Sequence, residues 1–179
     1  MISLKEAEVN GGREAVQRLQ TSIAATAAMV DQLSGQAKAC EAEIEAVRNS
    51  REHGLRKLFE RRWKEMRGDQ FEGYLAEVFS TLGYEVQQTG KSGDQGVDLI
   101  VQQNGKRVAI QAKGYVDSVS NAAVQQAFTG RRYYECSACA VITNSRFTAS
   151  AVELAASTEC VLVHEDNFED FVFGRITFT

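Results

Sequence analysis

Hydrophobic positions in the N-terminal third of the chain recur every three or four residues, the spacing of one face of an α-helix. Over residues 4–50 this pattern predicts one long helix with a heptad seam, which Thr26 interrupts. The seam consists of Val16, Leu19, Ile23, Val30, Leu33, Ala37, Cys40, Ile44 and Val47. We expect a coiled-coil dimer here, and the alternative is an antiparallel helix folded back on the rest of the chain.

A second, amphipathic helix is expected after His53-Gly54, where the seam breaks. Its apolar face holds Leu55, Leu58, Phe59, Trp63 and Met66. The surrounding residues 48–67 carry eight Lys or Arg against three Glu. Such a patch, including Arg61 and Arg62, can contact DNA phosphates. The alternative is a solvated charged helix face.

Beyond residue 67 the periodicity changes to short strands interleaved with helices. The predicted helices are 70–82, 119–134, 147–157 and 166–173, and the predicted strands are 84–89, 97–103, 106–113, 138–143 and 160–164. This alternation predicts an α/β domain with a mixed central sheet flanked by helices. The chain is therefore divided into a helical arm, residues 1–67, and a globular domain, residues 68–179.

Composition is that of an ordinary soluble domain, with 44% hydrophobic and 25% charged residues. The formal net charge of −4 gives no global nucleic-acid signature, although local patches can still bind DNA. The sequence has no apolar run long enough for a membrane span and no signal-peptide pattern, so we expect a cytoplasmic protein. Cys136 and Cys139 have the spacing of half a zinc site, but without a second pair we expect buried thiols.

Candidate chemistry gathers on two adjacent strands joined by an Asn-Gly turn. Asp98 lies on the first strand, and Gln111 and Lys113 lie at the end of the second. Because side chains alternate along a strand, these polar groups can converge on one face while apolar neighbours build the core. On this parity Val97 shares the apolar face with Leu99.

A hard cation such as Mg²⁺ prefers oxygen ligands, which Asp98 and the amide of Gln111 can supply. Lys113 can orient or deprotonate an attacking water, or stabilise charge that develops on a phosphate. The pattern is therefore typical of a metal-dependent phosphodiester hydrolase. Taken alone, the same residues could instead form a salt bridge between Asp98 and Lys113 at a sheet end.

Five segments in order carry a more specific signal: Phe71-Glu72, Leu82-Gly83-Tyr84, Ser92 to Leu99, Gln111-Ala112-Lys113, and Ile142 to Thr148 before Ala151. Together, over residues of about 70–173, they resemble the Mrr-type restriction endonuclease domain, a branch of the PD-(D/E)xK nuclease superfamily. The resemblance implies a restriction-endonuclease-like αβββαβ core. It also implies Mg²⁺-dependent cleavage of DNA, for which Mn²⁺ can substitute.

The resemblance places the catalytic residues at Asp98, Gln111, Lys113 and Glu72, with the metal held by Asp98, Gln111 and Glu72. Most of the superfamily has Glu or Asp at the position of Gln111, whereas the Mrr branch typically carries Gln. Glu72 could instead complete a capping arrangement with Asp69 at a helix start. Asp94, in a Gly-flanked loop, is a turn residue or a second metal ligand.

Further DNA contacts are expected from Lys91, Ser92 and Arg146, which lie in loops around the candidate site. Gln125, on the following helix, resembles a polar position of the family and could support the site. The expected function is that of a type IV-like restriction endonuclease that cuts duplex DNA as a homodimer or higher homo-oligomer. The alternatives are a non-cleaving DNA-binding module of the same fold and a Holliday-junction-type resolvase.

Overall fold

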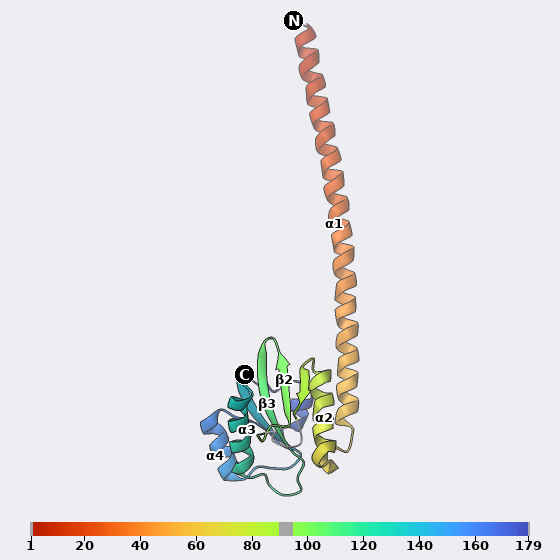
Figure 1. Cartoon of the computed structure of the whole chain (residues 1–179). Helices are drawn as coiled ribbons and strands as arrows, with labels where there is room; N and C mark the ends of the chain where they lie inside the picture. Colours follow the sequence, from red (N-terminus) through yellow and green to blue (C-terminus); the bar gives the residue numbers. More distant parts are fainter. Residues whose placement is uncertain (1, 90–94, 179) are drawn as a thin grey trace. The chain divides into compact units, whose positions relative to one another are not determined.

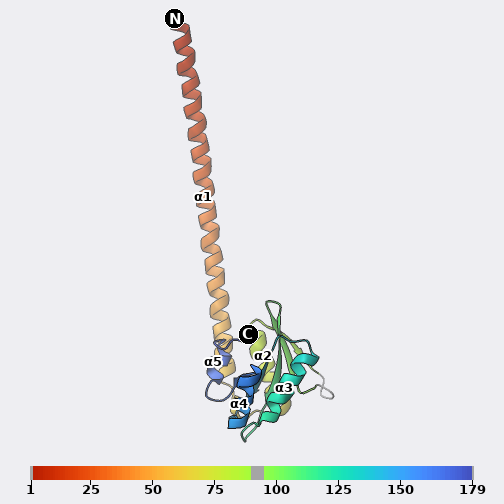
Figure 2. The same ribbon diagram turned by 90° about the vertical axis from the view of Figure 1, so that its left-hand side faces the viewer.

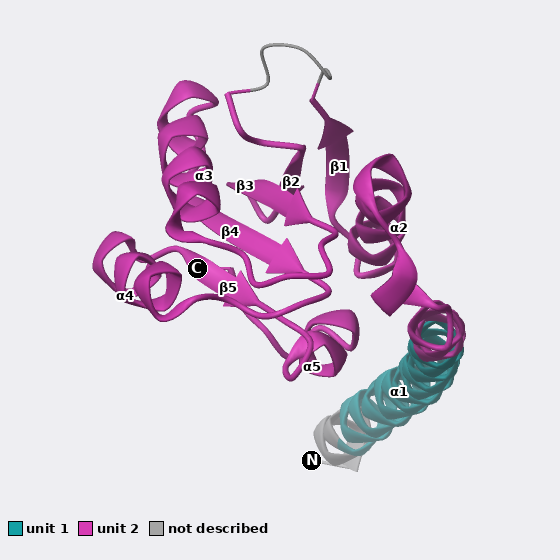
Figure 3. Ribbon diagram, turned by 90° about the horizontal axis from the view of Figure 1, so that it is seen from below, with its two compact units in different colours: residues 1–49 teal, residues 50–179 magenta. Residues whose placement is uncertain are grey.

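The computed structural model describes residues 2–89 and 95–178, with side chains from residue 9 onward. It divides into two compact units, residues 1–49 and residues 50–179 (Figure 3). None of its described helices is long and apolar enough to cross a membrane. Lys91, Ser92 and Asp94, named above as candidate site residues, lie outside the described residues.

The first unit is the N-terminal part of helix α1 (Ile2–Phe59), drawn in red to orange in Figure 1. The helix break expected at His53-Gly54 is absent, because α1 continues to Phe59. Leu55 and Leu58 are buried in the second unit. Their packing outweighs the roughly 1 kcal/mol that a glycine costs inside a helix. A 3-10 turn, Trp63–Glu65, follows α1 in place of a second basic helix.

The second unit is built on a mixed sheet whose described strands follow the order β1-β2-β3-β4-β5. The strands are β1 (Glu85–Gln88), β2 (Leu99–Gln103), β3 (Lys106–Lys113), β4 (Ala138–Thr143) and β5 (Val161–Val163). The first three are antiparallel neighbours, whereas β4 and β5 continue parallel to β3. The predicted αβββαβ core is confirmed.

Helices cover both sides of this sheet, as Figure 2 and Figure 3 show. They are α2 (Gly68–Thr81), α3 (Asn121–Tyr133), α4 (Ala149–Thr158) and α5 (Phe168–Val172). Helices α2 and α5 share one core with the sheet, and α3 and α4 share the other. The alternation of side chains along β2 and β3 therefore sends neighbouring residues into two separate cores.

The two cores differ in the size of their side chains. We call the α2 side the aromatic face, since it buries Trp63, Phe71, Tyr74, Phe79, Phe168, Phe171 and Phe178. We call the α3 side the small-residue face, since it buries Ala109, Ala123, Ala127, Cys139, Ala151, Ala155 and Cys160. Val97 packs on the small-residue face and not with Leu99, because it precedes the first residue of β2.

Candidate active site

The candidate site begins where β2 and β3 separate. The backbone N–H of Asp98 donates to the carbonyl of Ile110 at 2.9 Å, in line with the ladder of β2 and β3. Beyond Ile110, the last residue of β3 in register with β2, the N–H of Ala112 donates to Asp98 Oδ2 at 2.7 Å. The carboxylate thus takes the place of a strand partner, which fixes its position at the strand end.

Gln111 lies directly beside this carboxylate. Its Nε2 donates to Asp98 Oδ2. The two side chains therefore meet, as the alternation along the strands predicted. Gln111 is only 2% exposed, and its buried Oε1 has no hydrogen-bond partner in the part of the chain that the structure describes. A buried polar atom in this state costs about 1–3 kcal/mol. A hydrogen-bond donor or a cation at Oε1 would therefore stabilise this arrangement of the Gln111 side chain.

Lys113, the last residue of β3, is anchored through its backbone. Its carbonyl accepts a hydrogen bond from Thr143 Oγ1 of β4 at 2.6 Å. Its half-buried side chain lines a pocket of about 290 Å³ together with Tyr115, Ser118, Val119, Ser120, Ala122, Ala123 and Gln126. The polar pocket lies between the end of β3 and the start of α3, so a small polar group can reach the Lys113 ammonium there.

The pocket includes Gln126 of α3, which was not identified from the sequence, whereas Gln125 is not among its lining residues; both side chains are exposed. The helical spacing of α3 could have identified Gln126 from the sequence. It lies three residues after buried Ala123, and residues three apart share one side of a helix. Gly96 packs directly on Gln126: a Cβ at Gly96 would lie 2.5 Å from the Cβ of Gln126. This contact fixes the segment that leads into Asp98.

Glu72 lies on another element, helix α2. It is half-buried in α2, which packs on the aromatic face, whereas Gln111 follows the parity of Ala109 on the small-residue face. The neighbouring Phe71 lies 3.2 Å from where a Cβ of Gly114 would be. The start of α2 therefore adjoins the end of β3, and the assignment of Glu72 to the metal site stays a prediction.

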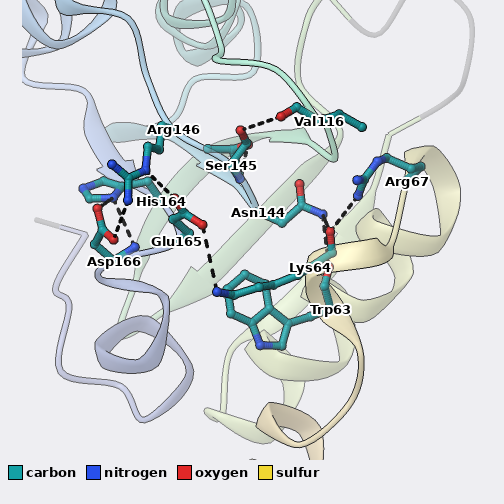
Figure 4. A network of polar contacts seen from close by, with 11 residues as sticks. Trp63, Lys64, Arg67, Val116, Asn144, Ser145, Arg146, His164, Glu165 and Asp166 are labelled. Carbon is teal, nitrogen blue, oxygen red and sulfur yellow. Dashed lines mark hydrogen bonds and ion pairs between the residues drawn. The ribbon is translucent and has the colours of Figure 1, made fainter.

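Asn144, at the end of β4, holds this end of the sheet together (Figure 4). Its Nδ2 donates to the carbonyls of Trp63 at 3.1 Å, Lys64 at 3.1 Å and Met66 at 2.8 Å. Its Oδ1 accepts from the N–H of Tyr115 at 3.0 Å. One buried amide thus ties the turn before α2 to the segment after Lys113, a role that the sequence motif around it did not reveal.

The predicted DNA-contacting arginines are paired with carboxylates. Arg61 pairs with Glu77 at 2.6 Å, and Arg62 pairs with Glu65 at 2.6 Å. Arg146 pairs with Glu165 and with Asp166 at 3.3 Å.

The hydrogen bond from Arg146 holds the pKa of Glu165 below its ordinary value. DNA phosphates would therefore compete with these carboxylates, and the DNA-contacting role of the arginines stays a prediction.

Metal-ligand clusters of the familiar kind are not found in the described ranges: no three His, Cys, Asp or Glu side chains gather there. Cys139 and Cys160 are buried and Cys136 is half-buried, each as a free thiol. At the strand ends, the described residues Asp98 and Gln111 offer a carboxylate and an amide oxygen, donors that suit Mg²⁺.

The family model Mrr_cat, described as restriction endonuclease, matches residues 63–172. The chain belongs to this restriction endonuclease family. The Mrr_cat match begins at Trp63, in the turn that Asn144 binds, and it contains Glu72, Asp98, Gln111 and Lys113. A comparison with curated proteins found no match.

Solved structures similar to the Mrr_cat domain include three with low sequence identity. The AF1548 protein, of unknown function, is 15% identical, with 52% of this chain and 55% of that chain covered and a TM-score of 0.46. AspBHI, a DNA modification-dependent restriction endonuclease, is 16% identical, with 71% and 36% covered and a TM-score of 0.48. MspJI, in complex with a 27-mer oligonucleotide, is 19% identical, with 70% and 31% covered and a TM-score of 0.43. The chain spans about half the length of the first and about a third of the others.

Proposed function

We propose that this chain is a Mg²⁺-dependent endonuclease that hydrolyses phosphodiester bonds of duplex DNA, in a type IV-like restriction defence against foreign or modified DNA. The observation that carries the proposal is the pairing of the Asp98 carboxylate with Gln111, whose buried Oε1 has no hydrogen-bond partner among the described residues, at a strand end that also bears Lys113. Membership of the restriction endonuclease family supports the nuclease activity.

The donor set fits a hard cation. A half-turn of the Gln111 amide exchanges Nε2 and Oε1, and it would bring two oxygens together at Asp98. That arrangement is repulsive unless a cation lies between them. Asp98 and Gln111 would then hold the metal, Mg²⁺ or Mn²⁺, with Glu72 supplied from α2. The metal would stabilise charge on the phosphate and lower the pKa of a bound water.

The protein's own groups would divide the remaining tasks. The hydrogen bond from Ala112 N–H keeps the Asp98 carboxylate oriented before substrate binds. Lys113 lines the polar pocket beside α3, and its ammonium would orient the attacking water or stabilise the negative charge that develops on the phosphate. Lys91, Ser92, Arg146, Arg61 and Arg62 would contact the DNA backbone.

Duplex cleavage requires one site for each strand. We therefore propose that the nuclease acts as a homodimer or higher homo-oligomer joined through the N-terminal helix, with duplex DNA as its partner in the cytoplasm. The exposed apolar side chains of α1 support this assembly.

The test is plasmid cleavage with Mg²⁺ or Mn²⁺ on methylated and unmethylated DNA. Asp98→Asn keeps an oxygen that can accept from Ala112 N–H, so the variant should fold while metal-dependent cutting is lost. Gln111→Glu should retain cutting and need less metal, because it adds a charge to the donor set. The exposed Glu153→Gln on α4 is the control and should cut normally.

Each other outcome has a defined meaning. Cutting that persists in Asp98→Asn would place the nuclease site elsewhere. DNA binding without cutting would favour the non-cleaving module, and preferential cutting of four-way junctions would favour the resolvase.

A further inference from the structure

Helix α1 carries a stripe of large apolar side chains that are exposed within its own unit. Each of these side chains is 53–68% exposed: Val9, Val16, Leu19, Ile23, Val30, Leu33, Ile44 and Val47. Helices in proteins gain most of their stability by packing an apolar face, and helix propensity alone contributes little. A contiguous apolar stripe of this kind marks an interaction surface.

The spacing of the stripe identifies the kind of partner. Positions a of the heptads are Val9, Val16, Ile23, Val30, Ala37 and Ile44, and positions d are Gly12, Leu19, Thr26, Leu33, Cys40 and Val47. Five of the six a positions are β-branched, and both leucines of the seam lie at d. Within parallel coiled coils, β-branched residues at a with leucine at d favour two strands over three or four.

Charges beside the seam agree with a parallel orientation. In a parallel, in-register pair, a g position faces the e position of the next heptad on the partner helix. Glu43 occupies g and Arg48, which pairs with Glu45 of its own helix at 3.0 Å, occupies the following e position, so opposite charges would lie near each other on both sides of the pair. The occupant that fits the stripe is therefore another copy of the same helix.

We propose that two copies of α1 form a parallel, in-register, two-stranded coiled coil over residues 9–47, in which Cys40 faces the partner's Cys40. This goes beyond the dimer proposed above, because it fixes orientation and register. Both chains then leave the coiled coil at the same end, so both nuclease units are attached there. The inference does not depend on DNA cleavage, and its tests use no DNA.

Thiol cross-linking of the full chain tests the register. A short bis-maleimide adds one thiol to each of its double bonds, so it joins two cysteines only when they are close. The native chain should give a linked dimer through Cys40, mapped by mass spectrometry. The matched variant Cys40→Ala with Ala42→Cys moves the thiol to the outward f position, and the linked dimer should be lost.

Sedimentation of full-chain variants tests whether the apolar seam holds the dimer together. Ile23→Asp places a carboxylate at a core a position, and it should raise the dimer dissociation constant by at least about 100-fold. Ala24→Asp adds the same charge one residue later, at an outward b position, and should leave the dimer intact. Circular dichroism and the unfolding transition of the nuclease unit show whether each variant still folds.

Three results would overturn the inference. The first is a native chain that sediments as a monomer at micromolar concentration, and the second is a trimer or tetramer. The third comes from Val16→Cys, which places a second thiol near the other end of the stripe. Links between positions 16 and 40, in place of 40 with 40, would show an antiparallel pair.

Discussion

The two faces of the central sheet are built from different kinds of side chain. The aromatic face buries large rings, such as Phe168, which stacks on Trp63 with ring centroids 3.9 Å apart. The small-residue face buries alanines, cysteines and Gly130, so α3 lies close to the segment that leads to Asp98. We therefore expect that substitutions on the first face affect mainly stability and that substitutions on the second affect mainly the geometry of the site.

The largest expected effect on stability tests the aromatic face. Phe168→Ala removes a fully buried ring and should lower the free energy of unfolding by about 3–5 kcal/mol. Urea unfolding followed by Trp63 fluorescence measures the change. Tyr133→Ala, an exposed aromatic at the end of α3, is the control and should stay within about 0.5 kcal/mol of the wild type. Equal losses in the two variants would remove the distinction between the faces.

A substitution at the site should separate activity from stability. Lys113→Met keeps the apolar stem and removes the ammonium, so the cleavage rate should fall by about 100- to 1,000-fold. The urea midpoint should change little, because the backbone contact with Thr143 remains. Single-turnover cleavage at saturating Mg²⁺ measures the rate, and normal cleavage would exclude Lys113 from the reaction.

Substitutions at two helix glycines test the close approach of α3 to the segment that leads to Asp98. Gly130→Ala places a Cβ 2.2 Å from Val97 Cγ2, and it should cost about 1–3 kcal/mol of stability. It should also lower cleavage, because Val97 adjoins Asp98. Gly73→Ala meets open space on α2 and should stabilise the chain by about 0.5–1 kcal/mol. Recovery of stability and activity in Gly130→Ala with Val97→Ala would tie both losses to this contact.

The smallest effect concerns the surface ion pairs beside the site. Glu165 has a folded-state pKa below its unfolded value, so its pairing with Arg146 stabilises the fold above the unfolded pKa and is lost as pH falls through the folded pKa. Arg146→Ala should therefore lower Tm slightly at neutral pH, and the difference should vanish on acidification. Thermal unfolding across a pH series checks this, and a difference that persists in acid would contradict the assignment.

Sequence patterns predicted the parts of the fold that depend on local alternation. The bounds expected for β3 and β4, residues 106–113 and 138–143, match the structure, and the parity of β3 brought Gln111 to Asp98. The prediction that Val97 shares a face with Leu99 was wrong, because Val97 lies outside the strand. The continuity of α1 through Gly54 depends on packing by distant residues, which no local pattern contains.

The amide of Asn144 is fully engaged inside the fold, which bears on how recognition of a DNA sequence could be altered. Its Nδ2 donates to backbone carbonyls, its Oδ1 accepts from a backbone N–H, and the residue is only 5% exposed, so the side chain is held away from a base edge. Libraries that vary the loops around the strand ends should therefore keep this asparagine constant. Changes in target preference should then come from residues whose polar atoms are still available to solvent.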